Sequence, residues 1–527
     1  EFTSMVNRAN TLIGNIGDLN RNIVIANGNN TSDQPSALLN ERDQAIDELA
    51  SIMGITVKES TTQNGAVTIN LTSGESLVLE NGAFNLFELN TNADLTFKQL
   101  KLETNFGSQT KADASIRIVE DDLGGALGGL FGYRNEILGP AMRDVGQLSV
   151  AFADAMNTQN KLGMDLDGQL GSNIFDIPSF RGLAYSDTNG DYVVTAQITE
   201  GKGAELTDAD YKIEVTAVTA GVPSQIEITL LNADGTPKKD ASGNDIIYSN
   251  YAVTAGFNGL PGGIEVDFSG TDPYTVGNEF LIQPTKDIAS KITLETNRPE
   301  DLAFASPVRA GANNTNLGSA NVIDVTVSNT EVGASAFDGA GGLLNSAPAQ
   351  INFTAADTYD VVDGSGNVLA TVTGTTDLTN LISQAGISPD PGFDLSLDGV
   401  PKAGDSFSIS YNTDGFNDNS NALNLAAIQN ENTVQVSSEA TNTPRTFQDA
   451  YASMVGRIGE DASMAKVTLA SAEAMKVQSQ NWFESVSGVS LDEEAANLIK
   501  YQQSYAAAAR ILSTAQELFN TILQSAR

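Results

Sequence analysis

The chain has 527 residues, enough for roughly three to four domains. It contains 28 Lys and Arg against 66 Asp and Glu, a formal net charge of −38, and it has neither Cys nor His. Without these two residue types the chain cannot use disulfides, a thiol nucleophile, a Ser-His-Asp triad or the usual zinc ligands. Its negative charge repels nucleic acid and anionic lipid, so we expect neither as a partner.

The N-terminal part of the chain is expected to alternate between helices and a small sheet. Two helices are predicted over residues 3–54, because apolar residues recur there at helical spacing, with Ser32 or Asp33 as candidate caps of the second. Alternating apolar and polar residues then predict a small hairpin region over 55–120. A third helical stretch is predicted over 123–160.

A glycine-rich run, GGALGGLFG, opens the third helical stretch, with Gly124, Gly128 and Gly132 four residues apart. It has the look of a phosphate-binding loop, but the preceding strand and the βαβ unit that such a loop needs are missing from the pattern. Glycines at this spacing on a helix more simply allow a second backbone to approach closely. We therefore favour a structural role for this run.

A β-rich segment is predicted over 170–418, where short alternating runs lie between clusters of Gly, Asn, Asp and Pro. We expect it to contain two related β domains, over 170–300 and 305–418. The second is very acidic, because residues 301–440 carry 16 Asp and Glu and only two cationic residues. No run of 18 apolar residues occurs in the chain, so no membrane-spanning helix is expected.

The two expected β domains are related by a weak internal repeat. The segments GIEVDFSGTDPYTVGNEFLI and GFDLSLDGVPKAGDSFSI align with one short gap. The alignment matches Gly263 with Gly392 and Gly277 with Gly404. Two strands joined by a glycine-containing turn explain this pattern.

Helix is predicted again from about residue 420 to the end, with Thr443 as a candidate cap, a stop at Gly488 and a capping box formed by Ser490 and Glu493. The last helix carries a heptad repeat, in which apolar or small residues recur every seven positions and again three positions later. This heptad seam consists of Leu491, Leu498, Tyr501, Tyr505, Ala508, Leu512, Ala515, Phe519 and Ile522. Leaving it in water would cost roughly 1.5–3 kcal/mol for each large side chain, so the seam needs a partner.

Three kinds of partner remain open for the heptad seam. It is either packed in the core of this chain, or covered by another chain, or covered by a segment that precedes residue 1 in a longer protein. We favour the second and third, and we predict that the seam is an assembly interface. The chain begins with Glu1 and not with Met, so we also expect it to lack the N-terminal segment of a longer protein.

Two groups of acidic residues in predicted loops are the best candidates for a metal site in this sequence. Asp165-Leu166-Asp167-Gly168 is similar to the start of a calcium loop, but Leu170 stands where that loop needs glycine. A second acidic cluster, formed by Asp414, Asp418 and Asn421, has no ligand spacing of its own. Solvated turns explain both groups, so no metal site is predicted.

No catalytic residue is predicted either. Paired carboxylates can hydrolyse glycosides without His or Cys, but no pair among the 66 acids is set apart in an aromatic-lined cleft. The single Trp482 is expected to pack within the C-terminal helices. We therefore expect no enzyme and no cofactor.

Four segments of the chain together resemble one family. They read PSALLNERDQAIDELASIMGI, GGALGGLFGYRNEILGPAMRDVGQLSVAFADAMNTQNKLGMDLDG, DGFNDNSNALNLAAIQ and SVSGVSLDEEAANLIKYQQSYAAAARILSTAQELFNTIL. In this order they resemble the FlgK family of hook-associated junction proteins, which are flagellar axial proteins. The last segment alone is shared by rod, hook and junction proteins, so the combination is what makes the resemblance specific.

The resemblance implies a structural component of the bacterial flagellum that joins the hook to the filament. Proteins of this family form a ring, contact the hook protein and the adjacent junction protein, and are exported by the flagellar type III apparatus to an extracellular position. Their terminal segments pair as a coiled coil, and an export chaperone binds the C-terminal helix. Without its N-terminal partner segment, this chain is expected to be monomeric, with residues from about 490 onward frayed or packed non-natively.

The expected architecture is multidomain α+β. Both chain ends, residues 1–165 and 420–527, are expected to form one elongated, coiled-coil-like helical bundle, into which the two all-β domains are inserted. Two alternatives remain for the function, namely another flagellar axial protein, or a secreted β-rich adhesin or glycan-binding protein. A hydrolase based on carboxylates is a third and less favoured reading.

Overall fold

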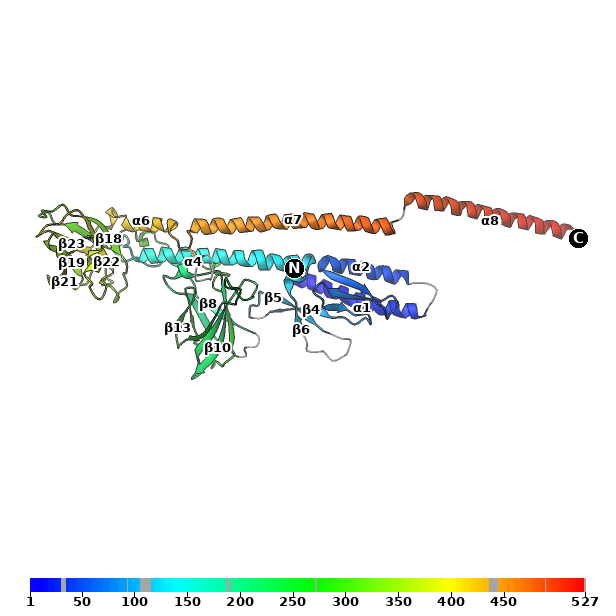
Figure 1. The fold of residues 1–527 in the computed structure, drawn as a ribbon, viewed down its shortest axis with the longest axis horizontal. Coiled ribbons are helices and arrows are strands. Elements are labelled where there is room, and N and C mark those ends of the chain that lie inside the picture. Colours follow the sequence, from blue (N-terminus) through cyan, green and yellow to red (C-terminus); the bar gives the residue numbers. More distant parts are fainter. Residues whose placement is uncertain are drawn as a thin grey trace. The chain divides into compact units, whose positions relative to one another are not determined.

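The computed structural model describes residues 1–29, 35–91, 93–104, 115–185, 188, 190, 192–270, 273–435, 444–488 and 490–525. The candidate caps Ser32, Asp33 and Thr443 lie outside the described residues. The chain divides into two units, Glu1–Met454 and Val455–Arg527. The first combines helices with several β-sheets and the second is helical, so the expected mixed α and β class is confirmed (Figure 1).

Helices α1 (Phe2–Asn29) and α2 (Ser36–Ile52) are the two helices predicted at the start of the chain. Apolar side chains at helical spacing, among them Ile13 and Ile16, leave one face of α1 buried. That face packs against α2 and against two small sheets that follow it. The sheets are β1-β2-β3, formed by Ile55–Glu59, Val67–Leu71 and Ser76–Val78, and β4-β5-β6, formed by Leu86–Thr91, Lys98–Glu103 and Ser115–Arg117.

Two asparagines attach α1 to these sheets. The Asn20 side chain donates to the carbonyl oxygen of Val67 at 2.7 Å and accepts from its N–H at 3.2 Å. Asn10 makes the same pair of bonds with Phe87, both at 2.8 Å. Each asparagine side chain thus bonds both the N–H and the carbonyl oxygen of one strand residue. These paired hydrogen bonds hold α1 in a defined position against the two sheets.

The predicted third helical stretch contains α3 (Gly125–Gly132), a π-helical turn η2 (Tyr133–Leu138) and α4 (Gly139–Lys161). A close backbone approach occurs where it begins, because a Cβ atom on Gly125 would lie 2.6 Å from the backbone of Ile52. A Cβ on Gly124 would likewise lie 3.3 Å from the N atom of Gly54. The prediction is wrong at Gly132, which has open space around its Cα, so the contact is made at the helix start and not along its face.

The first β-rich part is an eight-stranded antiparallel sheet in the order β12-β11-β10-β15-β8-β9-β14-β13. Its strands are β8 (Phe180–Ala184), β9 (Val194–Ile198), β10 (Asp210–Thr219), β11 (Val222–Leu231), β12 (Ile247–Ala252), β13 (Phe257–Leu260), β14 (Ile264–Asp267) and β15 (Glu279–Ile282). The two strands at its edges, β12 and β13, follow one another in the chain. Tyr251 of β12 donates its hydroxyl hydrogen to the carbonyl oxygen of Gly259 in β13 at 2.8 Å, which links the two edge strands. The strands of this sheet share one buried apolar core.

The second β-rich part combines a five-stranded sheet, β17-β23-β19-β20-β21, with the two-stranded ladder β18-β22. Its strands are β17 (Val308–Ala312), β18 (Asn321–Val327), β19 (Pro348–Ala355), β20 (Thr358–Asp363), β21 (Val368–Thr373), β22 (Phe393–Asp398) and β23 (Ser406–Tyr411). A single helical turn, α5 (Leu381–Gln384), covers β22. Phe353, Tyr359 and Phe407 lie in a shared core. A short pair, β7 (Phe175–Asp176) with β16 (Thr293–Leu294), contacts α4 through β7.

The internal repeat has a backbone basis. Gly263 and Gly392, matched in sequence, have φ of +71° and +82°, and Gly277 and Gly404 have +88° and +92°. Side chains with a Cβ rarely adopt this left-handed conformation, so glycine is needed at both positions of each copy. The strands that they flank are not paired with one another in either copy, because β14 and β15, like β22 and β23, bond to other strands.

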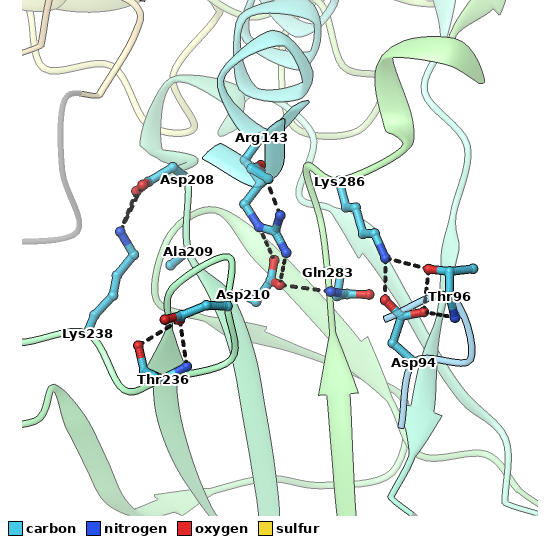
Figure 2. A network of polar contacts seen from close by, with 12 residues as sticks. Asp94, Thr96, Arg143, Asp208, Ala209, Asp210, Thr236, Lys238, Gln283 and Lys286 are labelled. Atoms are coloured by element: carbon cyan, nitrogen blue, oxygen red, sulfur yellow. Dashed lines mark hydrogen bonds and ion pairs between the residues drawn. The ribbon is translucent and has the colours of Figure 1, made fainter. Parts of the chain in front are cut away.

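Helix α4 is held to the eight-stranded sheet by a buried ion pair (Figure 2). The guanidinium of Arg143 donates through Nε to Asp210 at 3.0 Å, and a second nitrogen also contacts that carboxylate. Gln283 donates to the same carboxylate at 2.9 Å. The helix runs so close to the chain beyond β15 that a Cβ on Gly146 would lie 1.8 Å from the carbonyl oxygen of Thr285.

A second polar contact joins the sheet to the β4–β5 hairpin. Lys286 forms an ion pair with Asp94 and donates to the hydroxyl of Thr96 at 2.9 Å (Figure 2). Burial, the largest influence on Asp94, opposes its ionisation, but hydrogen bonds from Lys286 and Thr96 outweigh burial and lower its pKa below 3.8. The hairpin therefore contributes a charged anchor to the sheet.

The chain returns to α4 after the second β-rich part. Helix α6 (Ser420–Ala427) packs against α4, and Asn421 receives a hydrogen bond from Gln159 at 2.6 Å. Asn421 also donates to the carbonyl oxygen of Ala303 at 2.6 Å. Further along, Gln147 of α4 donates to the carbonyl oxygen of Gln435 at 2.8 Å.

Asp210→Ala should destabilise the contact between α4 and the sheet by about 3–5 kcal/mol, because it leaves the Arg143 guanidinium buried without its counter-charge. Native-state hydrogen exchange of the β10 amides measures this local free energy. Asp245→Ala is the control, since the Lys239–Asp245 pair is exposed and should contribute less than about 1 kcal/mol. Equal losses in the two variants would contradict the assigned role of the buried pair.

The stabilisation that the ion pair of Asp94 with Lys286 provides should weaken as the pH falls. Because the pKa of Asp94 is lowered on folding, its stabilising contribution is present above pH 3.8 and is lost as the pH falls through the lower, folded value. Lys286→Met should raise the pKa of Asp94, as followed by the carboxyl ¹³C shift. Lys291→Met removes the same charge nearby and should leave that titration almost in place.

Candidate assembly interface

The C-terminal part of the chain forms two long helices, α7 (Phe447–Ser487) and α8 (Leu491–Ser525), drawn in orange and red in Figure 1. The predicted stop is confirmed, because α7 ends one residue before Gly488. Ser490 accepts a hydrogen bond on its side-chain oxygen from the N–H of Glu493 at 3.4 Å, which is one of the two hydrogen bonds of the predicted capping box. Acidic residues in the first turn of α8 further favour its start.

All nine residues of the heptad seam lie on α8 and all are exposed. The large side chains of the seam range from 58% exposed at Leu498 to 86% at Leu491. The side chains over 462–486 and 490–524 are exposed as well. At roughly 1.5–3 kcal/mol for each large apolar side chain, covering the seam supplies a strong driving force for association. The role of the seam as an interface remains a prediction at this point.

Large and small residues alternate along the seam. Tyr505, Leu512 and Phe519 occupy one heptad position, while Ala508 and Ala515 occupy the other. The same position holds the large Tyr501 and Ile522 at the two ends, so the alternation is confined to residues 505–519. There the alanines let a partner backbone come close, and the large residues fill the holes between partner side chains. The pattern is thus suited to helix–helix packing and offers no polar cluster for catalysis.

Large apolar side chains near the end of α7 are exposed, which differs from the sequence-based expectation. The indole of Trp482 was expected to pack, whereas it is 67% exposed. Val486, one turn further, is 89% exposed. The single Trp does not stand out in a helical pattern, so periodicity alone could not assign it to the surface. Its position makes it a natural fluorescent reporter of association.

The acidic groups weighed as metal sites serve local structure. Asp165 accepts hydrogen bonds from the N–H groups of Asp167 and Gln169, at 2.9 and 2.8 Å, which closes a turn. Asp418 accepts from the side chain of Asn412 at 2.8 Å and from the N–H of Ser420 at 2.9 Å. Among the described residues, no three acidic, His or Cys side chains are grouped closely enough to hold a metal ion. In the same residues, no helix combines the length and apolarity needed to cross a bilayer.

Comparison with known proteins gives this arrangement a context. Residues 1–175 match the family model of the flagellar hook-associated protein FlgK helical domain, and residues 482–525 match that of the flagellar basal body rod FlgEFG protein C-terminal region. Flagellar hook-associated protein 1 of Salmonella typhimurium is 27% identical over 524 residues, which cover 99% of this chain and 70% of that protein. The relatives that match nearly the whole of this chain are flagellar hook-associated proteins.

Further relatives of the FlgK type agree. Flagellar hook-associated protein 1 of Escherichia coli K12 is 25% identical over 521 residues, covering 98% of this chain and 69% of that protein. The structure of the flagellar hook junction protein FlgK from Burkholderia pseudomallei superposes with a TM-score of 0.71 at 26% identity, over 92% of this chain and 84% of that one. The resemblance to the FlgK family that the sequence suggested is confirmed.

The two family-model matches fall on different elements. The helical-domain match covers α1 to α4 together with the two small sheets between them. The rod-type match covers α8 completely and thus the whole heptad seam. The seam therefore lies in a segment that is similar to proteins of the flagellar rod as well.

The amides of α8 should exchange rapidly when the chain is dilute and has no partner. Most helical stability in proteins comes from packing of an apolar face, and here that face is exposed. Hydrogen-exchange mass spectrometry should show residues 490–525 exchanging far faster than α4, whose Val150 and Ala153 are buried. Uniform protection of 490–525 at low concentration would contradict an exposed seam.

Proposed function

We propose that this chain is a structural subunit of the bacterial flagellum at the junction between hook and filament, and that it is not an enzyme. The observation that carries this proposal is the similarity to the flagellar hook junction protein FlgK over 92% of the chain. The two family matches, at opposite ends of the chain, support it independently. An adhesin or a glycosidase has no comparable support in the fold or the site.

Assembly is proposed to use the heptad seam. In this proposal the seam of α8 pairs, as a coiled coil, with apolar helical segments of neighbouring subunits, and repeated copies close into a ring. The exposed large side chains of the seam support it, because burial of each releases free energy only when a partner is present. The hook protein and the adjacent junction protein are the proposed neighbours on either side of the ring.

We also propose a domain organisation for the chain. Residues 1–165 and 420–527 form one elongated helical domain, and two β domains, over 170–300 and 305–418, are inserted in it. Contacts of α4 with the returning chain support this proposal, namely those of Gln147 with Gln435 and of Phe152 with Phe447, whose ring centroids lie 5.8 Å apart. The separate apolar cores of the two β-rich parts support the boundary between them.

Export through the flagellar type III apparatus to the cell exterior completes the proposal. A chain without Cys forms no disulfide that would hinder passage in an unfolded state. An export chaperone would cover the exposed seam of α8 before assembly, since an uncovered apolar stripe promotes aggregation. The same surface would thus serve two partners in succession.

Deletion of the gene in the source bacterium should leave bare hooks and shed flagellin into the medium, because filament subunits would have no junction on which to assemble. Electron microscopy of the cells and immunoblotting of the medium measure the two effects. Normal filaments on the deletion strain would overturn the proposed junction role and would favour another axial protein or an adhesin.

Complementation with Leu498→Asp and Leu512→Asp together should restore few or no filaments, since two charges in the seam oppose its burial. Gln503→Asp is the matched control, because it adds a charge to α8 outside the seam and should restore filaments. Both proteins must be followed in the medium. A double variant that is secreted but does not assemble supports the seam as an interface, whereas full filaments on it would refute that role.

A further inference from the structure

Strand β18 has a free edge in the second β-rich part. It pairs only with β22 in the ladders of residues 301–435, all of which the structure describes. In an antiparallel pair, alternate N–H and C=O groups bond to the partner and the others point away from it. Half of the backbone groups of β18 are therefore directed at the side opposite β22. Strand β17 lies close to β18, but within these residues no ladder joins the two strands, so these groups of β18 have no strand partner.

A groove of about 690 Å³ lies along this edge. Six consecutive residues of β18, Val322–Val327, form one wall. The other wall comes from the loop that contains Asp414 and Asp418 and from Leu423 of α6, while Arg309 of β17 also borders the space. β17 is itself the last strand of its sheet. Six residues of extended chain, at about 3.3 Å each, match the length of this wall.

The walls of the groove are partly apolar. Ile323 and Leu423 are 59% and 62% exposed, and both line the groove. The ladder with β22 shifts register between Val322 and Asp324, so a bulge lies at Ile323. Bulges protect strand edges from unwanted pairing, but this one affects only the start of β18 and leaves residues 324–327 in regular register.

Charge selects the kind of segment that fits. Asp324, Asp414 and Asp418 line the groove against the single cation Arg309. The surrounding chain, residues 301–440, carries 16 Asp and Glu and two cationic residues. An approaching Lys or Arg side chain is therefore attracted, while an acidic strand, such as one from a second copy of this β-rich part, is repelled.

We propose that the open edge of β18 binds an extended segment of a partner protein that contains Lys or Arg, by addition of a strand in this groove. Backbone hydrogen bonds to β18 supply the pairing, Asp324 and its acidic neighbours attract the cationic side chains, and Ile323 and Leu423 contact the apolar side chains between them. The surface is separate from the heptad seam, so it would serve a different partner. It does not depend on the proposed position of the chain in the flagellum.

Three labelled peptides test this inference on the full chain. The probe alternates Lys and Val over six residues, the second alternates Glu and Val, and the third is the Lys-Val peptide with N-methyl groups on alternate residues. Fluorescence anisotropy at low salt should show binding of the first peptide only. Hydrogen exchange should then slow at residues 324–327. N-methylation removes backbone donors without changing charge, so loss of binding there identifies strand pairing.

Two substitutions complete the test. Asp324→Lys should weaken binding of the Lys-Val peptide about fivefold, since it replaces an exposed attraction by a repulsion. Glu331→Lys makes the same charge change outside the groove and should alter the affinity less than twofold. Equal binding of all three peptides, equal effects of the two substitutions, or no binding of the Lys-Val peptide would each overturn the proposal, and the peptide comparison holds even if a variant does not fold.

Discussion

The structure of the first unit depends on α4 and on the ion pair that Arg143 of this helix makes with Asp210. Both side chains are 3% exposed, so the pair exists only because each charge compensates the other in a medium that would not solvate either. The eight-stranded sheet and the returning chain both contact α4. A charged pair of fixed geometry fits this position because, unlike apolar packing, it defines an orientation as well as a contact.

The buried interior of the first unit differs from the C-terminal helix α8, whose apolar side chains are not buried. In the first unit, the apolar side chains of the helices and strands gather in three large buried cores. In α8 the apolar periodicity is equally clear, yet the side chains are exposed. The same physical pattern thus marks a folded core in one place and a proposed assembly surface in the other.

Much of the fold could be predicted from the sequence, and the reasons are local. The heptad spacing from Leu491 to Ile522 and the cap at Ser490 define α8 without any tertiary contact. The glycines of the repeat, such as Gly277 and Gly404, mark left-handed positions that only glycine adopts easily. Long-range contacts could not be predicted in this way, because nothing in the sequence around Arg143 points to a carboxylate 67 residues away.

The residues of the heptad seam could be named from the sequence, whereas other exposed surfaces of the chain could not. The exposure of Trp482 and the free edge of β18 depend on which elements lie beside them, and periodicity contains no information about that. The sequence set Asp165 and Asp418 aside as metal ligands on grounds of spacing, but their roles in closing turns became visible only with their hydrogen-bond partners.

The alternation of large and small seam residues between Tyr505 and Phe519 of α8 has a consequence for symmetry. If two copies of α8 lay parallel and in register, Ala508 would face Ala508 and Ala515 would face Ala515, and two layers of the contact would be underfilled. Unfilled space of this kind costs free energy in any packed interface. A different helix, with bulky side chains opposite the alanines and small ones opposite Tyr505 and Phe519, would fill every layer. The surface of α8 is therefore better shaped for a non-identical helix than for its own copy, and a contact between unlike surfaces lets identical subunits join head to tail, so that they close into a ring when the rotation between neighbours divides a full turn.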